Sequence, residues 1–194
     1  MKTPLPIARI LAAVATAILT FSLVHPAGAD QIVNGGFETG SFSGWTVNDP
    51  SGFTNIGPNP LFAESGTYHA NLGAKGLLGT LSQNVGTTMG QSYQLSFWLT
   101  SDSDVPPNEF DVFWNGVEIL NLVNLPAQDY THYSFTVSAT SNMTPLVFQY
   151  RNDDDFFRLD DVALSVPETS STLGLLLLSV TGLAVFPAAR KRQK

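Results

Sequence analysis

Four side chains in the middle of the chain have the chemistry to hold a polyhydroxylated ligand. Trp98 and Phe113 are aromatic, yet each stands at a polar position of an alternating segment. Gln149 and Arg151 stand at polar positions of a third segment. An aromatic ring packs against the apolar face of a pyranose, while amide and guanidinium groups hydrogen-bond its hydroxyls. These residues form a candidate glycan-binding surface, with two alternatives open: loops cover the rings, or Trp98 lies on the opposite sheet.

The sequence carries no constellation typical of an enzyme. After the first 29 residues the histidines are His69 and His132, and neither stands in a His-x-x-x-His spacing or beside a Gly-x-Ser-x-Gly motif. The chain has no cysteine, which excludes a thiol nucleophile, a disulfide framework and a Cys-type zinc site. A glycosidase needs two carboxylates across a cleft, and nothing in the sequence indicates such a placement. We therefore expect a non-catalytic protein.

Charge restricts the partners of the central region. Residues 30–166 hold three Lys and Arg against fifteen Asp and Glu, a formal charge of −12. Neutralising phosphates requires clustered basic residues, so nucleic acid and anionic lipid are excluded as partners. A domain with this negative charge is expected to bind divalent cations or neutral ligands. The acidic run 153–155 is expected to be a solvated turn rather than a second cation site.

The N-terminal segment resembles a secretory signal peptide in its layout. Lys2 and Arg9 precede the apolar run 10–24, and small residues end at Ala29. The run is about 15 residues long, shorter than the roughly 20 that span a bilayer. We therefore expect cleavage after Ala29.

The C-terminal segment combines a short motif, an apolar stretch and a basic tail. The motif contains Pro167, Glu168 and Thr169, the apolar stretch is 173–189, and Arg and Lys dominate 190–194. At 1.5 Å per residue the apolar stretch reaches about 25 Å, which is marginal for a membrane span. The basic tail would hold this helix on the cytoplasmic side.

This layout resembles the PEP-CTERM class of sorting signals. The resemblance implies an exosortase-type processing enzyme as a partner and a transient anchor in the inner membrane of a Gram-negative bacterium. Thr169 stands where that class has its second proline. Two other interpretations stay open: a sortase signal of the Leu-Pro-x-Thr-Gly type, and a plain anchor that is not cleaved.

The region between the two ends reads as a series of short strands. Apolar and polar residues alternate with a period of two, which is typical of half-buried strands, and helical periodicity is missing. The predicted strands are 67–72, 80–85, 92–100, 110–114, 117–120, 133–139, 146–150 and 158–166. Asn115 and Gly116 between two apolar runs predict a two-residue hairpin. Many short strands with frequent turns in a chain of this length indicate a β-sandwich.

Several motifs resemble the galactose-binding-like jelly roll, especially carbohydrate-binding modules found beside xylanases and glucanases. In chain order they are VNGGFE at 33–38, GW at 44–45, ESGTY at 64–68, SYQLSFW at 92–98 and LDDVAL at 159–164. The resemblance spans nearly all of 33–164. It implies a fold that sugar binders, adhesins and structural modules share, so it says less about the ligand.

The same resemblance implies a structural Ca²⁺ that ties the ends of the sandwich together. The ligands carried over by position are the carboxylates of Glu38, Glu64 and Asp160 and the carbonyls of Gly36 and Thr67, with Asp161 as the substitute if the register shifts by one. Ca²⁺ takes six to eight oxygen ligands and would neutralise these acids. The alternative is that the Glu caps a turn and the Asp lies on a solvated edge.

These observations predict three segments: a signal peptide (1–29), an all-β jelly-roll sandwich (30–166) and a sorting signal with a transmembrane helix (167–194). The first functional hypothesis is a secreted, surface-sorted, non-catalytic module that binds glycan or exopolysaccharide in the extracellular matrix. The second is a structural matrix or adhesion protein that binds no sugar. Binding to a glycan array distinguishes the two.

Overall fold

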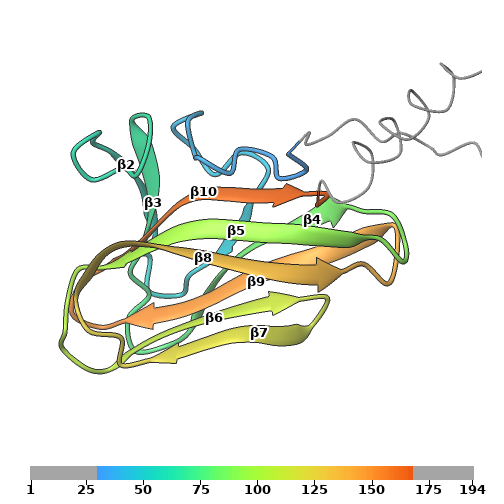
Figure 1. The fold of residues 1–194 in the computed structure, drawn as a ribbon. Helices are drawn as coiled ribbons and strands as arrows, with labels where there is room; N and C mark the ends of the chain where they lie inside the picture. Colours follow the sequence, from blue (N-terminus) through green and yellow to red (C-terminus); the bar gives the residue numbers. More distant parts are fainter. Residues whose placement is uncertain (1–29, 168–194) are drawn as a thin grey trace, which may run out of the picture.

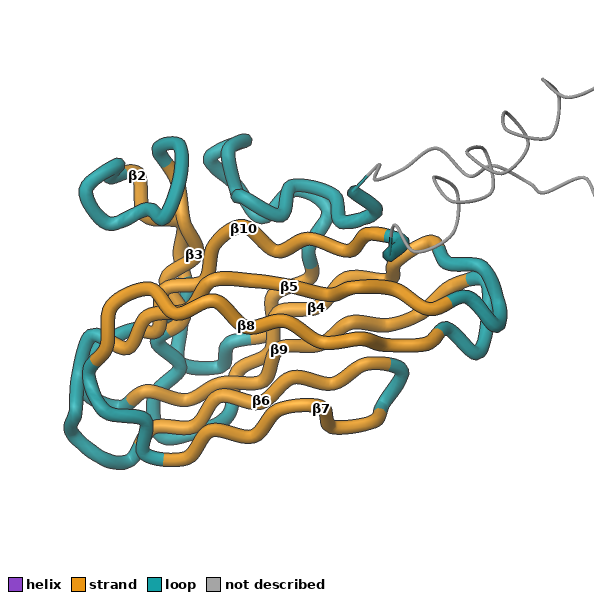
Figure 2. The backbone as a smooth tube through the Cα atoms, viewed as in Figure 1, coloured by secondary structure: helices purple, strands orange, loops and turns teal. Residues whose placement is uncertain are grey.

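The computed structural model describes residues 30–167, which form two five-stranded antiparallel sheets packed face to face (Figure 1). The predicted all-β sandwich is confirmed, and no helix occurs within these residues (Figure 2). The signal peptide with its cleavage at Ala29, and the sorting segment from Glu168 onward, lie outside the described residues. No helix of the described part is long and apolar enough to cross a membrane.

Each sheet draws its strands from both halves of the chain. Sheet A has the order β1 (Thr46–Asn48), β4 (Gly79–Gly86), β9 (Met143–Asn152), β6 (Asn108–Trp114) and β7 (Val117–Val123). Sheet B has the order β2 (Asn55–Pro58), β3 (Tyr68–Leu72), β10 (Phe157–Ser165), β5 (Ser92–Ser101) and β8 (Gln128–Ser138). Pairing between distant segments therefore decides which side chains become neighbours.

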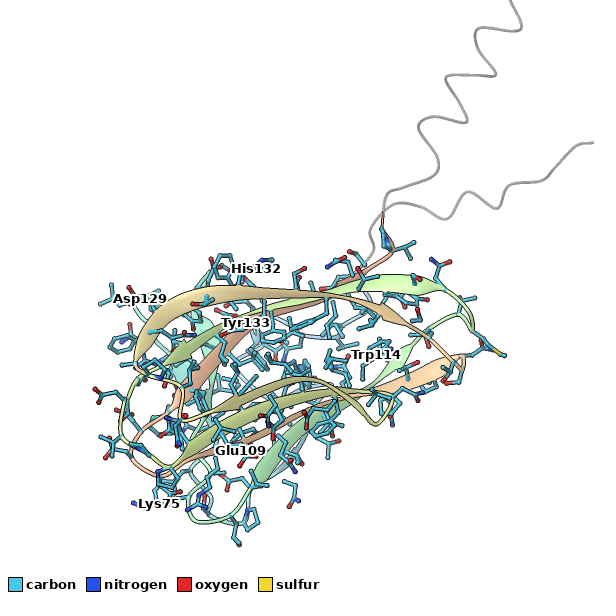
Figure 3. The ribbon with its side chains drawn as sticks, turned by 60° about the horizontal axis from the view of Figure 1, so that its bottom comes forward. Lys75, Glu109, Trp114, Asp129, His132 and Tyr133 are labelled. Carbon is cyan, nitrogen blue, oxygen red and sulfur yellow. The ribbon has the colours of Figure 1, made fainter. Side chains whose placement is uncertain are left out.

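The core lies between the sheets and is built from alternate residues of the long strands. In β5 the buried apolar residues are Tyr93, Leu95, Phe97 and Leu99, in agreement with the period-two pattern. The Phe97 ring packs edge-on against Phe148 of sheet A with ring centroids 5.3 Å apart. Trp114 also lies between the sheets, whereas Glu109 of sheet A and His132 of sheet B lie on the two outer surfaces (Figure 3).

Turn geometry confirms the predicted hairpin between β6 and β7. Asn115 has φ +52° and Gly116 has φ +74°, the left-handed conformations that a two-residue type I′ turn requires. The two strands that the sequence did not predict, β1 and β2, have only three and four residues. Strands this short show no recognisable alternation, and β2 also contains Gly57 and Pro58.

The two ends of the described chain are joined. The Asp30 carboxylate accepts hydrogen bonds from the backbone N–H groups of Ile32 (2.9 Å) and Leu164 (3.0 Å). Gln31 N–H donates to the Leu164 carbonyl (3.1 Å). Both sheets and the buried core are complete between these ends, so residues 30–167 contain the contacts that the sandwich needs to fold on its own.

Candidate ligand and metal sites

Three of the four predicted ligand-binding residues lie on one surface. Strands β6 and β9 are neighbours, and their register places Phe113 opposite Val147 and Asp111 opposite Gln149. Because the alternate residues face the core, Phe113, Gln149 and Arg151 point to the outer face of sheet A, where all three are half-buried. Strand pairing thus brings together residues that lie far apart in the sequence.

Trp98 does not belong to this surface. It lies on β5 in sheet B, where it pairs across the strands with His132 of β8. The two rings lie 4.8 Å apart between centroids, and Trp98 is half-buried. Trp98 therefore lies on the opposite sheet, the placement that the sequence analysis left open, and only Phe113, Gln149 and Arg151 share a surface. Alternation shows which face of its own strand a residue occupies but not which sheet the strand joins.

Asp111 is a further member of the outer face of sheet A. Its side chain is 2% exposed, and its Oδ1 accepts a hydrogen bond from Asn121 Nδ2 of β7 (2.7 Å). Burial and the negative charge of nearby Glu109 raise the pKa of this carboxyl to about 6. The sequence indicated this placement, because Asp111 lies two residues before Phe113 and therefore points to the same face of the strand. The face therefore combines an aromatic ring with amide and carboxyl groups.

Arg151 is held by an ion pair. Its Nε and Nη2 donate to the two carboxylate oxygens of Asp153 at 2.8 and 2.6 Å. This pairing lowers the pKa of Asp153 to about 2. The acidic run 153–155 is exposed at Asp154 and Asp155 as expected, but it is not held open by repulsion alone: Asp153 binds Arg151, and Asp154 accepts a hydrogen bond from Ser103 Oγ (2.6 Å).

The residues of the predicted calcium site also converge. Asp160 is completely buried, and its Oδ2 accepts hydrogen bonds from the N–H groups of Glu64 (2.9 Å) and Ser65 (3.4 Å). Glu38 Oε1 accepts hydrogen bonds from the N–H groups of Thr67 and Tyr68, both at 2.9 Å. The loop before β3 therefore bridges the N-terminal segment and the last strand.

Gly36 and Asp161 belong to the same cluster. A Cβ atom added at Gly36 would lie 3.1 Å from Asp161 Oδ1 and 3.9 Å from Asp160 Oδ1. Asp161 has φ +46°, and a β-bulge interrupts the pairing of β10 with β5 between Asp160 and Ala163. The bulge turns the second carboxyl toward the loop, where Ser65 Oγ donates to Asp161 Oδ1 (3.1 Å).

The charges of this cluster fit a cation. Burial raises the pKa of Asp160 to about 7, and a hydrogen bond shared with Asp161 raises the pKa of Glu64. Ionising these acids together costs free energy that a bound Ca²⁺ would remove. Among residues 30–167, however, no three Asp, Glu, His or Cys side chains are arranged to hold a metal by themselves. Backbone carbonyls, such as those expected from Gly36 and Thr67, must complete the ligand set.

Arg158 pairs with an acid that lies far from it in the sequence. It forms an ion pair with Asp102 of the segment after β5 at 2.5 Å. Its guanidinium also lies over the Phe62 ring, 4.2 Å from the centroid. Trp45 and Trp114 both belong to the buried core, where they are 7% and 4% exposed.

Comparison with known proteins supports the fold. No protein-family model and no curated protein matches this sequence. Among solved structures, TmCBM61 in complex with β-1,4-galactotriose aligns with a TM-score of 0.62 at 18% identity, covering 72% of this chain and 100% of the other. The xylan-binding domain from CBM 22 aligns with a TM-score of 0.52 at 14% identity, covering 74% and 99%.

A third structure is an adhesin. The K1 cleaved adhesin domain of Lys-gingipain from Porphyromonas gingivalis W83 aligns with a TM-score of 0.50 at 14% identity, covering 66% of this chain and 96% of that domain. At such identities the likeness concerns the fold alone. Residues 30–167 therefore form a two-sheet jelly-roll sandwich of the architecture that carbohydrate-binding modules and this adhesin domain share.

Proposed function

We propose that this protein is a secreted, non-catalytic module that binds a glycan on the outer face of sheet A. The observation that carries the proposal is the convergence of Phe113 and Gln149 on adjacent strands, with Asp111 and Asn121 beside them. The ring offers a surface for the apolar face of a pyranose, and the amide and carboxyl groups bond its hydroxyls. The solved sugar-binding structures of the same fold support glycan binding in general.

The structural role of Ca²⁺ is part of the proposal. Glu38, Glu64 and Asp160, with the carbonyls of Gly36 and Thr67, would hold the ion, and Asp161 stands within the same cluster. The ion would offset the charge of the buried carboxyls and tie the last strand to the loop before β3. Binding of glycan on sheet A would not require it directly.

Export and sorting complete the proposed function. The layout of residues 1–29 and 167–194 supports secretion, a transient inner-membrane anchor and processing by an exosortase-type enzyme. The mature domain would then act at the cell surface or in the extracellular matrix, with polysaccharide as its partner.

A glycan array probed with residues 30–167 tests the glycan-binding proposal. We expect binding to one class of neutral polysaccharide, and Phe113→Ala should weaken it by about tenfold, the effect of losing one aromatic contact. Trp98→Ala on the opposite sheet is the matched control and should leave binding unchanged. If no polysaccharide on the array binds, the domain acts as a structural matrix or adhesion module and the glycan proposal is wrong.

A further inference from the structure

Each sheet has two edge strands, and three of these four edges are protected against pairing with another chain. β1 has three residues, and β2 has four residues and ends at Pro58. β7 carries a β-bulge at Ile119, because Leu120 pairs with Val112 of β6 while Glu118 pairs with Phe113. Short strands, proline and bulges all disfavour edge-to-edge pairing. The fourth edge is β8, at the end of sheet B.

β8 is a long edge with little protection. It has eleven residues, the most of any strand in the described part of the chain, and it contains no proline and no lysine. Its pairing with β5 shifts register only before Thr131, so the residues from Thr131 to Ser138 follow one unbroken register. Eight residues of strand extend about 26 Å. A regular edge of this length is a template for a further strand.

Alternate backbone groups of β8 face the free edge. Ala139, just after the strand, donates its N–H to the Gln91 carbonyl (2.9 Å) and therefore bonds toward β5. The bonding side alternates along an antiparallel strand, so the N–H and C=O groups of His132, Ser134 and Thr136 point away from β5. Among residues 30–167, these groups have no hydrogen-bond partner in the protein.

The open side of the sandwich next to β8 is also apolar. Tyr133 and Phe135 stack against the buried core, yet both remain half-buried because β8 is the last strand of its sheet. Tyr133 lies on the inner side of the strand and His132 on the outer side (Figure 3). Leu122 of β7, the edge strand of the other sheet, is likewise only partly buried. A molecule seated on this side would cover an apolar seam as well as the backbone groups.

Charge favours a second copy of this chain as that molecule. Residues 30–166 carry a formal charge of −12, so two copies repel across most of their surfaces. From Tyr130 to Ser138, however, β8 contains no Asp, Glu, Lys or Arg. Two such edges meet without like charges opposite each other, and the edge has no charge that would attract a basic or acidic partner. An antiparallel edge is also complementary to itself under a two-fold rotation.

We propose that two copies of this protein form a dimer through β8, antiparallel about a two-fold axis at Ser134. Ser134 then lies opposite its counterpart, and His132 lies opposite Thr136 of the second copy. The three residues of each copy exchange about six main-chain hydrogen bonds across the axis. Sheet B becomes one continuous sheet that runs through both copies.

The dimer leaves the outer face of sheet A free. Phe113 and Gln149 belong to the other sheet, so each copy keeps its own candidate glycan surface. Where the proposed glycan binding holds, two linked surfaces bind one polysaccharide more tightly than either alone. The pairing itself does not depend on glycan. A protein that fails on the glycan array can still form the dimer, and a monomer can still bind glycan.

The first experiment is sedimentation of residues 30–167 over a range of concentrations without glycan. We expect a monomer–dimer equilibrium with a dissociation constant on the order of 100 μM, as suits a small interface. Ser134 is exposed, so Ser134→Lys and Ser134→Glu should fold normally. Each variant alone places like charges opposite each other and should weaken the dimer about fivefold, whereas an equimolar mixture of the two should restore it.

Ser96→Lys is the matched control. Ser96 pairs with Ser134 on the same face, but it lies in β5 between two other strands, so the dimer should be unaffected. A native protein that stays monomeric at millimolar concentration overturns the proposal. So does a dimer that persists unchanged in both Ser134 variants, or a mixture of the two that stays monomeric.

Hydrogen exchange identifies the strand edge directly. The amides of His132, Ser134 and Thr136 should become protected as the native protein dimerises and should stay unprotected in Ser134→Lys. The amides of Tyr133 and Phe135, which face β5, should be protected in both. Protection of the first three amides in a monomeric full-length chain would show that the chain's own terminal segment occupies the edge, and would overturn the dimer.

Discussion

Asp111 is a buried carboxyl on a surface that already carries two other acids, Glu109 and Glu118. Burial is the main reason that its pKa is raised to about 6, and the neighbouring charges act in the same direction. Between about pH 4 and pH 6 the folded protein binds more protons at this site than the unfolded chain does. The free energy of unfolding therefore falls as the pH rises through this range. An acid that costs stability at neutral pH is more consistent with a role in binding than with a role in folding.

Asp111→Asn tests this argument. The substitution keeps the shape of the side chain and an oxygen that accepts the bond from Asn121, but it removes the charge. We expect the variant to be more stable than the native protein at pH 7.5, on the order of 1 kcal/mol, and equally stable at pH 4. Urea unfolding at the two pH values measures the difference. Asp104→Asn, at an exposed position, is the control; a gain from Asp111→Asn that is equal at both pH values would contradict the explanation.

The hairpin between β6 and β7 holds Phe113 next to the edge of the sheet. Gly116 has φ +74°, and nothing lies within 4 Å of a Cβ added there, so the cost of a side chain is conformational rather than steric. We expect Gly116→Ala to lower the free energy of unfolding by about 1 kcal/mol. Gly86→Ala in β4 is the matched control, because its Cβ also meets open space and its φ is not positive. Chemical denaturation of both variants tests this, and equal effects would show that the left-handed backbone is not the cause.

The eight predicted strands are all present, and those with clear alternation, 92–100, 110–114, 133–139 and 146–150, are long enough to show which residues face the core. Their pairing could not be predicted. Phe113 and Gln149 share a surface because β6 lies beside β9, and Trp98 does not because β5 pairs in the other sheet. These neighbours depend on contacts between distant segments, which a local pattern does not contain.

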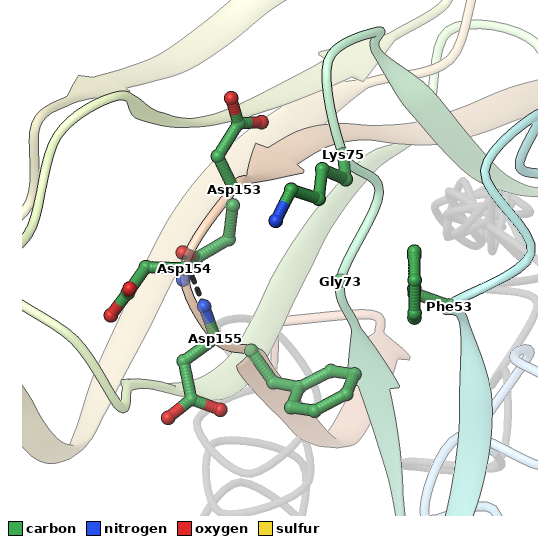
Figure 4. Close-up of a pocket in the computed structure, with 8 residues that line it drawn as sticks. Phe53, Gly73, Lys75, Asp153, Asp154 and Asp155 are labelled. Carbon is green, nitrogen blue, oxygen red and sulfur yellow. Dashed lines mark hydrogen bonds between the residues drawn. The ribbon is translucent and has the colours of Figure 1, made fainter.

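The calcium cluster was predicted through resemblance, and the structure brings its residues together. A pocket at one end of the sandwich, lined by Phe53, Gly73, Lys75 and residues 152–156, was not predicted at all (Figure 4). Apart from Asn152, the last residue of β9, its lining comes from three loops, where no periodicity indicates which way a side chain points, and Phe53 and Phe156 are ordinary loop residues in the sequence. A missing hydrogen-bond partner such as that of Asn152 Nδ2 becomes visible only in three dimensions.

At the scale of the whole molecule, the ends of the described chain and the pocket lie at opposite ends of the sandwich. β10 runs along the length of the sheet from Phe157, next to the pocket, to Ser165, next to the bonds between Asp30 and Leu164 (Figure 1). Nine residues of strand extend about 30 Å. If the segment after Pro167 anchors the protein, the end of the sandwich that carries the pocket faces away from the membrane.

Sorting makes a prediction about the mature chain. If an exosortase-type enzyme processes the C-terminal segment, the cell-associated protein should lack the residues beyond roughly 169–173 and should begin at Asp30. Intact mass spectrometry of protein from its native host measures both ends. A mass that still includes Lys194 would contradict processing and favour a plain anchor.

Calcium links the ends of the sandwich in the proposed site, since Glu38 lies before the first strand and Asp160 lies in the last. An ion that binds only the folded state stabilises it by RT ln(1 + [L]/Kd), about 2.7 kcal/mol at a hundredfold excess over Kd. For a domain of this size the melting temperature should rise by several degrees. Calorimetry of residues 30–167 in millimolar CaCl₂ and in chelator measures the rise.

Two variants distinguish calcium binding at this site from a general effect of calcium on an acidic domain. Asp160→Asn removes the buried charge and should abolish most of the calcium response, whereas Asp154→Asn, in the exposed run near the pocket, should leave it nearly intact. Chelation should remove the gain without unfolding the protein, because apolar side chains packed between the sheets form the core. Equal melting temperatures in calcium and in chelator would reject the site. The converged carboxyls of Asp160, Glu64 and Asp161 would then be held by hydrogen bonds and protonation alone, which the raised pKa of Asp160 already favours.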